Sequence, residues 1–225
     1  MRRVSILALV TLSLPASAAD LPLTARGNEP FWTLDIAAEG MTFSRMGDKG
    51  AESWPLPAAA TDGATTTYAL PDGAVVTVAD RVCRDSMSGM PFPASVTIAR
   101  NGETLAGCGG QPGALLTAHP WRVTEVGGTG LPTDVALEGT LAFDGSTASG
   151  KSFCNRFTGS YALTGEVLSF GPVAGTRMAC PEPQGALESG MLDALSATTR
   201  FDLGEDGSLV LIAGDAPVLR ALPAP

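Results

Sequence analysis

The sequence predicts a mainly β protein in two parts, the second of which adds one main helix to an antiparallel sheet. Three observations favour this fold: short apolar and polar alternations recur along the chain, turn-forming residues separate them, and one segment has helical spacing. Hydrophobic residues make up 44% of the chain and charged ones 16%, which suits an ordered, folded protein and argues against a disordered tail or a coiled coil.

The first 18 residues are predicted to be a cleaved signal peptide. Arg2 and Arg3 precede an apolar run over 4–14, and the small residues 16–18 suit signal peptidase. The run is too short to span a bilayer, which takes about 20 helical residues. No Cys stands near the cleavage site to carry a lipid anchor. We therefore expect a periplasmic or secreted mature chain without an integral membrane segment; the alternative is an uncleaved N-terminal anchor.

The expected mature chain is strongly acidic. Once the two signal arginines are removed, 12 of the 14 Lys and Arg residues remain against 23 Asp and Glu, a net charge of −11. Such a surface repels the phosphates of nucleic acids and of anionic lipids, so we expect neither as a partner. The acidity indicates solubility or attraction to a cationic partner, and we expect a monomer.

The first domain, 22–110, is predicted to be an all-β antiparallel meander or small barrel. Residues that alternate on one strand face form three runs: Trp32, Leu34 and Ile36; Ala74, Val76 and Val78; Val96 and Ile98. Turn signals separate the runs, at Glu39-Gly40, Gly47-Asp48, Asp62-Gly63, Pro71-Asp72-Gly73 and Asn101-Gly102. The stretch 109–113, Gly-Gly-Gln-Pro-Gly, interrupts every periodicity and indicates a domain boundary.

The second domain, 118–223, is predicted to be α+β. Apolar residues alternate again in four runs: Val135, Leu137, Leu141 and Phe143; Leu168 and Phe170; Phe201 and Leu203; Leu209 and Leu211. Between Pro183 and Thr198 the spacing changes to three and four, at Leu187, Met191, Ala194 and Leu195. That spacing predicts an amphipathic helix before the last hairpin.

The four cysteines all lie in the expected mature chain, and none forms a C-x-x-C motif. Of the three possible connectivities we predict local pairing, Cys83 with Cys108 and Cys154 with Cys180, as suits an exported protein. Each bridge would stabilise the fold by about 3.5 kcal/mol in the chain-entropy model. A zinc site is the alternative, and the single His and the lack of close ligand pairs argue against it.

The sequence shows no established catalytic constellation. His119, the only histidine, lies beside Pro120, and there is no G-x-S-x-G motif and no unbridged cysteine nucleophile under the predicted pairing. A paired-acid glycosidase would need two neighbouring carboxylates, whereas the candidates are scattered: Glu29, Asp35, Asp85 and Glu188. No helix signal follows either glycine run, 107–110 or 127–128, so neither predicts a phosphate loop. We expect no enzymatic activity, cofactor or metal.

Two motifs occur in order in the second half. The first is 152–161, Ser-Phe-Cys-Asn-Arg-Phe-Thr-Gly-Ser-Tyr; the second is 176–180, Thr-Arg-Met-Ala-Cys, followed by Glu188 on the predicted helix. With Trp121 near the start and the run 209–212 near the end, residues 118–223 resemble the META domain, the family of the HslJ heat-shock proteins of bacterial envelopes. The resemblance implies a role in envelope stress and antibiotic tolerance, without an assigned reaction. The family more often has Gly where this chain has Phe153, so the local turn is expected to differ.

The resemblance marks six residues of possible binding function: Asn155, Arg156, Tyr161, Arg177, Met178 and Glu188. We expect these motifs to determine the fold first. Asn155 would hold a left-handed turn or satisfy buried backbone groups, and Met178 would pack in the core. Tyr161 and Trp121 would be core aromatics with one polar end. Arg177 beside Glu188 would form a rim ion pair.

The first half resembles an uncharacterised exported module that often precedes META domains, in 27–32, Gly-Asn-Glu-Pro-Phe-Trp, in 83–93 and in 107–109. The run 88–92, Ser-Gly-Met-Pro-Phe, is also similar to the S-G-x-x-Y loop of MliC-type inhibitors of c-type lysozyme, with Phe92 in place of Tyr. The alternative is a disulfide-tethered turn.

These observations together predict a non-enzymatic periplasmic protein of envelope stress or maintenance that binds a partner protein or a small ligand. The alternative is an inhibitor of c-type lysozyme that acts through the Ser88-Gly89 loop. An unrecognised hydrolase is the third hypothesis.

Overall fold

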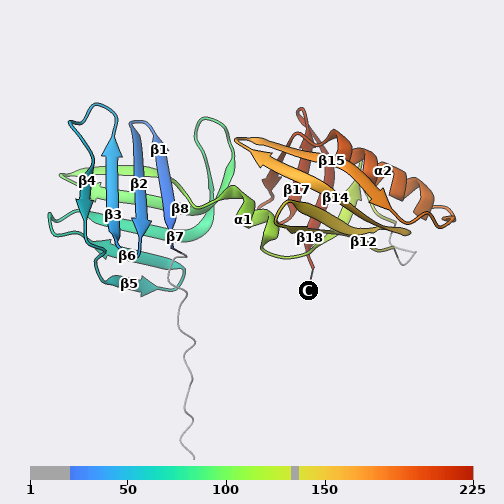
Figure 1. Ribbon diagram of the computed structural model, residues 1–225, viewed down its shortest axis with the longest axis horizontal. Coiled ribbons are helices and arrows are strands. Elements are labelled where there is room, and N and C mark those ends of the chain that lie inside the picture. Colours follow the sequence, from blue (N-terminus) through green and yellow to red (C-terminus); the bar gives the residue numbers. More distant parts are fainter. Residues whose placement is uncertain (1–20, 133–136, 225) are drawn as a thin grey trace, which may run out of the picture.

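The computed structural model describes residues 21–132 and 137–224. Two nine-stranded antiparallel sheets follow one another along the chain, and a short helix joins them (Figure 1). The predicted fold class, mainly β with one main helix in the second half, is confirmed. The expected signal peptide, 1–18, and Val135 lie outside the described residues. In the part of the chain that is described, no helix has the length and apolarity needed to cross a membrane.

The first sheet is a meander in two halves that meet where β1 pairs with β9. Its strands are β1 (Leu23–Asn28), β2 (Phe31–Ala37), β3 (Gly40–Arg45), β4 (Glu52–Trp54), β5 (Ala59–Asp62), β6 (Thr65–Ala69), β7 (Val75–Arg84), β8 (Pro91–Arg100) and β9 (Glu103–Gly109). Their order in the sheet is β4-β3-β2-β1-β9-β8-β7-β6-β5. Because β4 and β5 are consecutive in the chain but lie at opposite edges, the chain between them must connect the two edges, and the sheet curls around its core.

One face of this sheet forms the first core, and all three predicted runs of alternating residues lie in it. Trp32 also explains two glycines of the sequence motifs. A Cβ on Gly27 would collide with the indole Nε1 of Trp32, and a Cβ on Gly107 would collide with the carbonyl of Arg26 and the edge of the same indole. Both glycines are therefore required for the close approach of backbone and ring.

The segment that joins the sheets corrects one expectation of the sequence analysis. A helix, α1 (Pro112–Thr117), follows the glycine run 107–110, where no helix was predicted. Its six residues are too few for a periodic pattern, and its N-cap residue makes no side-chain cap, so only Pro in the first turn marked it. Leu116 is fully buried in the second core, and Trp121 Nε1 donates a hydrogen bond to the carbonyl of Leu116 at 2.8 Å. The helix is thus fixed to the second domain, and Trp121 is the expected core aromatic with a satisfied polar end.

The second sheet runs in the order β15-β14-β13-β12-β10-β18-β17-β16, with β11 beside β10. Its strands are β10 (Trp121–Val126), β11 (Thr129–Gly130), β12 (Gly139–Asp144), β13 (Thr147–Ser152), β14 (Asn155–Thr164), β15 (Val167–Gly175), β16 (Arg200–Leu203), β17 (Leu209–Ala213) and β18 (Ala216–Pro223). Leu141 and Phe143 alternate on β12 as expected, but Leu137 precedes that strand and only packs against the core.

The predicted helix is confirmed as α2 (Gln184–Ala197), which lies along one side of the second sheet (Figure 1). Met191, Ala194 and Leu195 are buried, and Leu187 packs against the core from its edge. The helical spacing of these residues therefore places one apolar stripe against the sheet.

Phe153 occupies a backbone conformation that favours glycine, with φ +68°. Its ring is buried and lies over Gly139, where an added Cβ would come within 2.7 Å of the Phe153 Cζ. The turn thus differs from the family pattern in its side chain. Phe153 takes the left-handed position where the family more often has Gly, and Gly139 leaves space for the Phe153 ring.

We expect Gly139→Ala to lower the free energy of unfolding by about 1–3 kcal/mol in the wild-type chain, because the added methyl group overpacks the ring of Phe153. The same substitution should cost much less in a Phe153→Gly background, where the ring is absent. Urea denaturation of the four proteins of this double-mutant cycle measures the coupling. Equal costs in the two backgrounds would show that the ring and the glycine are independent.

Candidate functional site: the interdomain groove

The loop between β7 and β8 is fixed by one carboxylate. Asp85 Oδ1 accepts hydrogen bonds from the backbone N–H of Ser88 at 2.9 Å and of Met87 at 3.0 Å, and from the Ser88 hydroxyl at 3.0 Å. Asp85 Oδ2 accepts a hydrogen bond from Asn28 Nδ2 at 2.8 Å. Asn28 ends β1, so the two motifs of the first half meet here. Gly89 follows at φ +74°, in the left-handed region.

The pKa of Asp85 lies below its ordinary value. Partial burial acts to raise this pKa, but the hydrogen bonds from Ser88, Asn28 and Met87 stabilise the ionised carboxylate and outweigh it. A carboxyl whose pKa is lowered in the folded state adds stability above its unfolded pKa. That stability is lost as the pH falls through the lower folded value.

We expect Asp85→Asn to lower the free energy of unfolding by about 1 kcal/mol at neutral pH, because the new amide N–H₂ would face the Asn28 amide and one acceptor is lost. The difference between variant and wild type should stay constant above about pH 5 and shrink below about pH 4. Denaturation curves from pH 3 to pH 8 measure it. A difference that is independent of pH over this range would contradict the ionised role of Asp85.

The same loop joins the two domains. Met90 belongs to the buried core of the second domain, with 6% of its surface exposed, and Phe92 packs against that core. Arg84 donates from Nε to Asp202 Oδ1 at 3.1 Å and from Nη2 to the carbonyl of Leu203. Helix α1 also contacts both β8 and β12. Apolar, ionic and backbone contacts thus hold the domains in one arrangement.

Between the domains these contacts leave a groove of about 820 Å³, which we call the interdomain groove. Seven residues of the first domain line one side: Arg26, Asn28, Asp85, Ser88, Met90, Phe92 and Cys108. The hairpin of β14 and β15 lines the other with Tyr161, Leu163 and Glu166, and residues 111–113 lie between them. The lining mixes hydroxyl and amide groups with aromatic and aliphatic surface, as ligand sites do.

Tyr161 is the META-type motif residue that reaches this groove. Its ring packs edge-on against Phe143, with the centroids 4.9 Å apart. Burial raises the pKa of the Tyr161 hydroxyl, and the carboxylate of Asp144 adds to the effect. Tyr161 is therefore the expected core aromatic, and it stays neutral while lining the groove.

Asn155 holds the two motifs of the second half together. Its Oδ1 accepts hydrogen bonds from the Thr176 hydroxyl at 2.6 Å and from the backbone N–H of Met178 at 2.9 Å, and its Nδ2 donates to the Met178 carbonyl at 3.2 Å. The Glu188 carboxylate accepts a hydrogen bond from the Asn155 backbone N–H at 2.9 Å. Of the two expected roles for Asn155, satisfying backbone groups is confirmed. The left-handed turn belongs to Phe153 instead.

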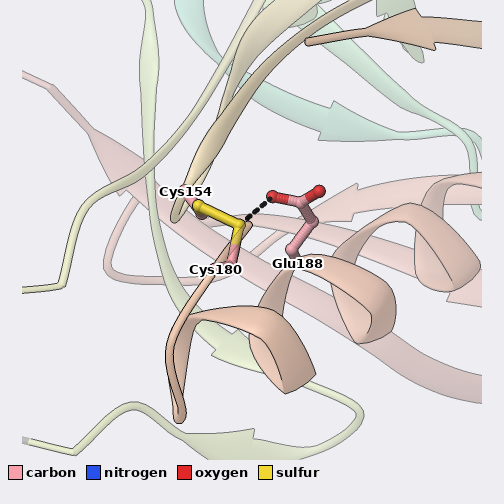
Figure 2. Close-up of side chains that lie close together, drawn as sticks. All are labelled: Cys154, Cys180 and Glu188. Carbon is pink, nitrogen blue, oxygen red and sulfur yellow. Dashed lines mark hydrogen bonds between the residues drawn. A yellow bond between two sulfur atoms is a disulfide. The ribbon is translucent and has the colours of Figure 1, made fainter. Parts of the chain in front are cut away.

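Both predicted disulfides are confirmed, Cys83 with Cys108 and Cys154 with Cys180. Figure 2 shows the second beside Glu188, whose Oε2 lies 3.7 Å from the Sγ of Cys180. Ligand atoms of these three residues lie within 4.8 Å of one another, a spacing compatible with a metal ion. With the bridge closed, however, neither sulfur is a thiolate, so the group offers one strong ligand, the carboxylate.

Residues 114–224 match the META domain family. This half of the chain is a META domain. An NMR structure of a protein from Burkholderia xenovorans is 31% identical, covering 51% of this chain and 88% of that one, with a TM-score of 0.43. A second NMR structure is 28% identical, covering 48% of this chain and 91% of that one, with a TM-score of 0.39. Among curated proteins, none matches the chain.

Within the META domain, two expectations about the motif residues are wrong. Met178 is 61% exposed rather than in the core, because Asn155 binds its backbone at the surface. Glu188 binds Asn155, and within residues 21–132 and 137–224 no ion pair joins it to the exposed Arg177. Arg156 is exposed, and its backbone N–H binds the Thr176 hydroxyl. Of the six motif residues, only Tyr161 lines the interdomain groove.

The residues considered for catalysis have different surroundings. His119 is exposed, with its ring edge-on to Trp121 at 5.3 Å. Asp35 accepts a hydrogen bond from the Thr24 hydroxyl at 2.6 Å. Asp85 is bound by residues of its own loop and by Asn28, and Glu188 on α2 is bound by Asn155. Glu29 is exposed. Asp35, Asp85 and Glu188 are thus each engaged in hydrogen bonds to other parts of the fold.

Sequence reasoning missed several groove residues, namely Arg26, Gln111, Ser146 and Glu166. They lie in a strand, the linker and two turns, where polar residues are ordinary. Only the docking of the two domains brings them to one groove, and no local pattern signals it.

Proposed function

We propose that this protein is a non-enzymatic binding protein of the bacterial envelope that takes a small ligand in the interdomain groove and acts in envelope stress or maintenance. The META domain supports an envelope-associated role, and the two disulfides are compatible with a periplasmic or secreted protein.

One observation carries the proposal: the motifs of both halves line the same groove. Asn28, Asp85 and Ser88 come from the first half, and Tyr161 comes from the META domain. The wall made by the β7–β8 loop is held by Asp85 and by the buried Met90, so it is ordered before any ligand arrives. A preorganised site loses less conformational entropy on binding.

The absence of catalysis is part of the proposal. All four cysteines are bridged, so none is a free nucleophile, and the ring of His119 packs edge-on against Trp121. The Asp85 carboxylate, which lines the groove, accepts three hydrogen bonds from its own loop and a fourth from Asn28. It is a positioning group rather than an available base.

Inhibition of c-type lysozyme through the Ser88-Gly89 loop has less support from the geometry. The Ser88 hydroxyl binds Asp85 and accepts a hydrogen bond from the Met90 N–H at 3.2 Å, and Phe92 packs against the META domain. The loop is thus committed to the contact between the domains.

We expect the mature protein at micromolar concentration to leave c-type lysozyme activity unchanged in physiological salt. The rate at which lysozyme clears a suspension of bacterial cell walls, with and without the protein, measures this activity. Inhibition that resists salt and disappears in Ser88→Asp would establish the inhibitor instead; inhibition lost at moderate salt would show only charge attraction.

The proposed function is tested by NMR of the ¹⁵N-labelled mature chain against a collection of mono- and disaccharides, di- and tripeptides and nucleosides. Binding compounds should shift the amide signals of Ser88, Ser146 and Tyr161 together, and Ser146→Trp, which fills the groove, should abolish these shifts. Ser160→Trp, at an exposed position of β14 that does not line the groove, is the control. Shifts that persist in Ser146→Trp, or binding confined to other surfaces, would refute the groove as the site.

A further inference from the structure

A second hollow adjoins the interdomain groove and has unusual charge. It encloses about 250 Å³ on the first domain and is lined by three arginines, Arg26, Arg81 and Arg84; we call it the arginine cleft. The cleft and the groove share Arg26, Asn28, Asp85 and Cys108 in their linings. Asp85 is the only acidic residue in the cleft lining, although the chain carries 23 acidic residues.

The sheet brings two of these arginines toward one row of residues on its outer face. Arg26 on β1 lies opposite Cys108 on β9, and Cys108 lies opposite Ser95 on β8. Arg81 reaches the same row from β7, where it donates from Nε to Ser95 Oγ at 2.8 Å. The register of β7 shifts between Asp80 and Cys83, and such a bulge redirects the side chains that it contains.

The charges of Arg26 and Arg81 are not neutralised within the described part of the chain. Ion pairs there join Arg84 to Asp202, and in a different hollow join Arg45 to Glu103 at 2.8 Å and Arg100 to Glu52 at 2.9 Å. Neither Arg26 nor Arg81 takes part in an ion pair between residues 21–132 and 137–224. The Asp85 oxygens are occupied by Asn28, Met87 and Ser88, so this carboxylate is not a partner for them either.

We infer that the arginine cleft binds an oxyanion, a phosphate or a carboxylate, carried by the ligand whose body lies in the interdomain groove. Guanidinium groups bind such anions through paired N–H donors, and the Nη groups of Arg81 stay available because its contact with Ser95 uses Nε. Ser86 and Thr97 add hydroxyl groups to the lining. An anion here would also relieve the repulsion between neighbouring cations. The inference deepens the proposed function, because it names the charge of the ligand.

The test is a titration of the ¹⁵N-labelled mature chain at constant ionic strength with four probes: inorganic phosphate, glucose 6-phosphate, glucuronate and glucose. We expect saturable shifts of the amides of Ser95, Thr97 and Gly107 with a phosphate or with glucuronate, and none with sodium chloride. Arg26→Gln and Arg81→Gln should each weaken binding by about tenfold or more. Arg122→Gln, an exposed arginine on β10 of the META domain, is the matched control and should bind as the wild type does.

The arms of this titration separate the possible outcomes. Preference for the phosphates or for glucuronate identifies the oxyanion. Arg81→Lys should bind the anion more tightly than Arg81→Gln does, since lysine keeps the positive charge but lacks the paired donors of the guanidinium. Well-dispersed spectra show that each variant is folded. Saturable shifts that are unchanged in Arg26→Gln and Arg81→Gln, or no saturable shift with any anion, overturn the inference. If no anion binds but neutral compounds still bind in the groove, the inference about the arginine cleft is wrong and the proposed function stands. If anions bind in the cleft but Ser146→Trp does not weaken the binding of any compound in the groove, the proposed function is wrong and the anion site stands.

Discussion

Met90→Ala is expected to lower the free energy of unfolding by about 2–5 kcal/mol, because the truncation leaves a cavity in the core of the neighbouring domain. Met90 comes from the first domain, yet it is buried among residues of the META domain. Its loss removes a main apolar contact between the domains. In differential scanning calorimetry we therefore also expect one unfolding transition for the wild type and two for Met90→Ala.

Met87→Ala is the matched control, because Met87 lies in the same loop with 70% of its surface exposed. Its effect should stay within about 0.5 kcal/mol. If Met90→Ala proves as mild as Met87→Ala, or if both proteins unfold in one unchanged transition, the loop does not couple the domains. The groove would then lack the rigid wall on which the proposed function depends.

Asn155→Ala is expected to destabilise the META domain by about 2–4 kcal/mol. The substitution leaves the backbone groups of Met178 and the Thr176 hydroxyl without their partner, and each lost hydrogen bond in this partly buried site costs about 1 kcal/mol or more. Chemical denaturation monitored by tryptophan fluorescence measures the change. Cys154→Ser should be similarly destabilising, by about 3.5 kcal/mol in the chain-entropy model.

The neighbouring substitution Arg156→Ala is the control for Asn155→Ala, since the Arg156 side chain is exposed and the bond from its backbone N–H remains. It should change stability by about 0.5 kcal/mol at most. A different result would revise the role of the motif: loss of ligand binding in Asn155→Ala at unchanged stability would mean that Asn155 belongs to a binding site and not to the scaffold.

The sequence predicted well where a local rule controls the structure. The alternation of Trp32, Leu34 and Ile36 predicted their buried face, because successive side chains of a strand point to opposite sides. Helical spacing predicted α2 to within one residue at each end. Local pairing of the cysteines was also correct, because each disulfide joins segments of one domain.

Prediction failed where a partner distant in the sequence decides the outcome. Met178 has an apolar side chain of the kind that usually packs in a core. Asn155, however, binds the Met178 backbone in a surface loop, and the side chain is left exposed. Glu188 was expected to pair with the nearby cation of Arg177, whereas the backbone N–H and amide of Asn155 take its carboxylate. Charge and hydropathy alone do not specify which of several possible partners the fold presents.

For this protein the sequence by itself determined the fold class, the main helix, the apolar runs of the two cores, the disulfides and the META domain, because periodicity, turn residues and motif spacing act over short stretches of chain. The tertiary structure alone decided how the domains dock, through Met90 and Arg84, and therefore where the groove and the arginine cleft lie. Arg26 and Arg81 are ordinary strand residues in the sequence. Only the pairing of β1 with β9, the shift in β7 and the absence of a carboxylate partner for either residue in the described chain make them a candidate anion site.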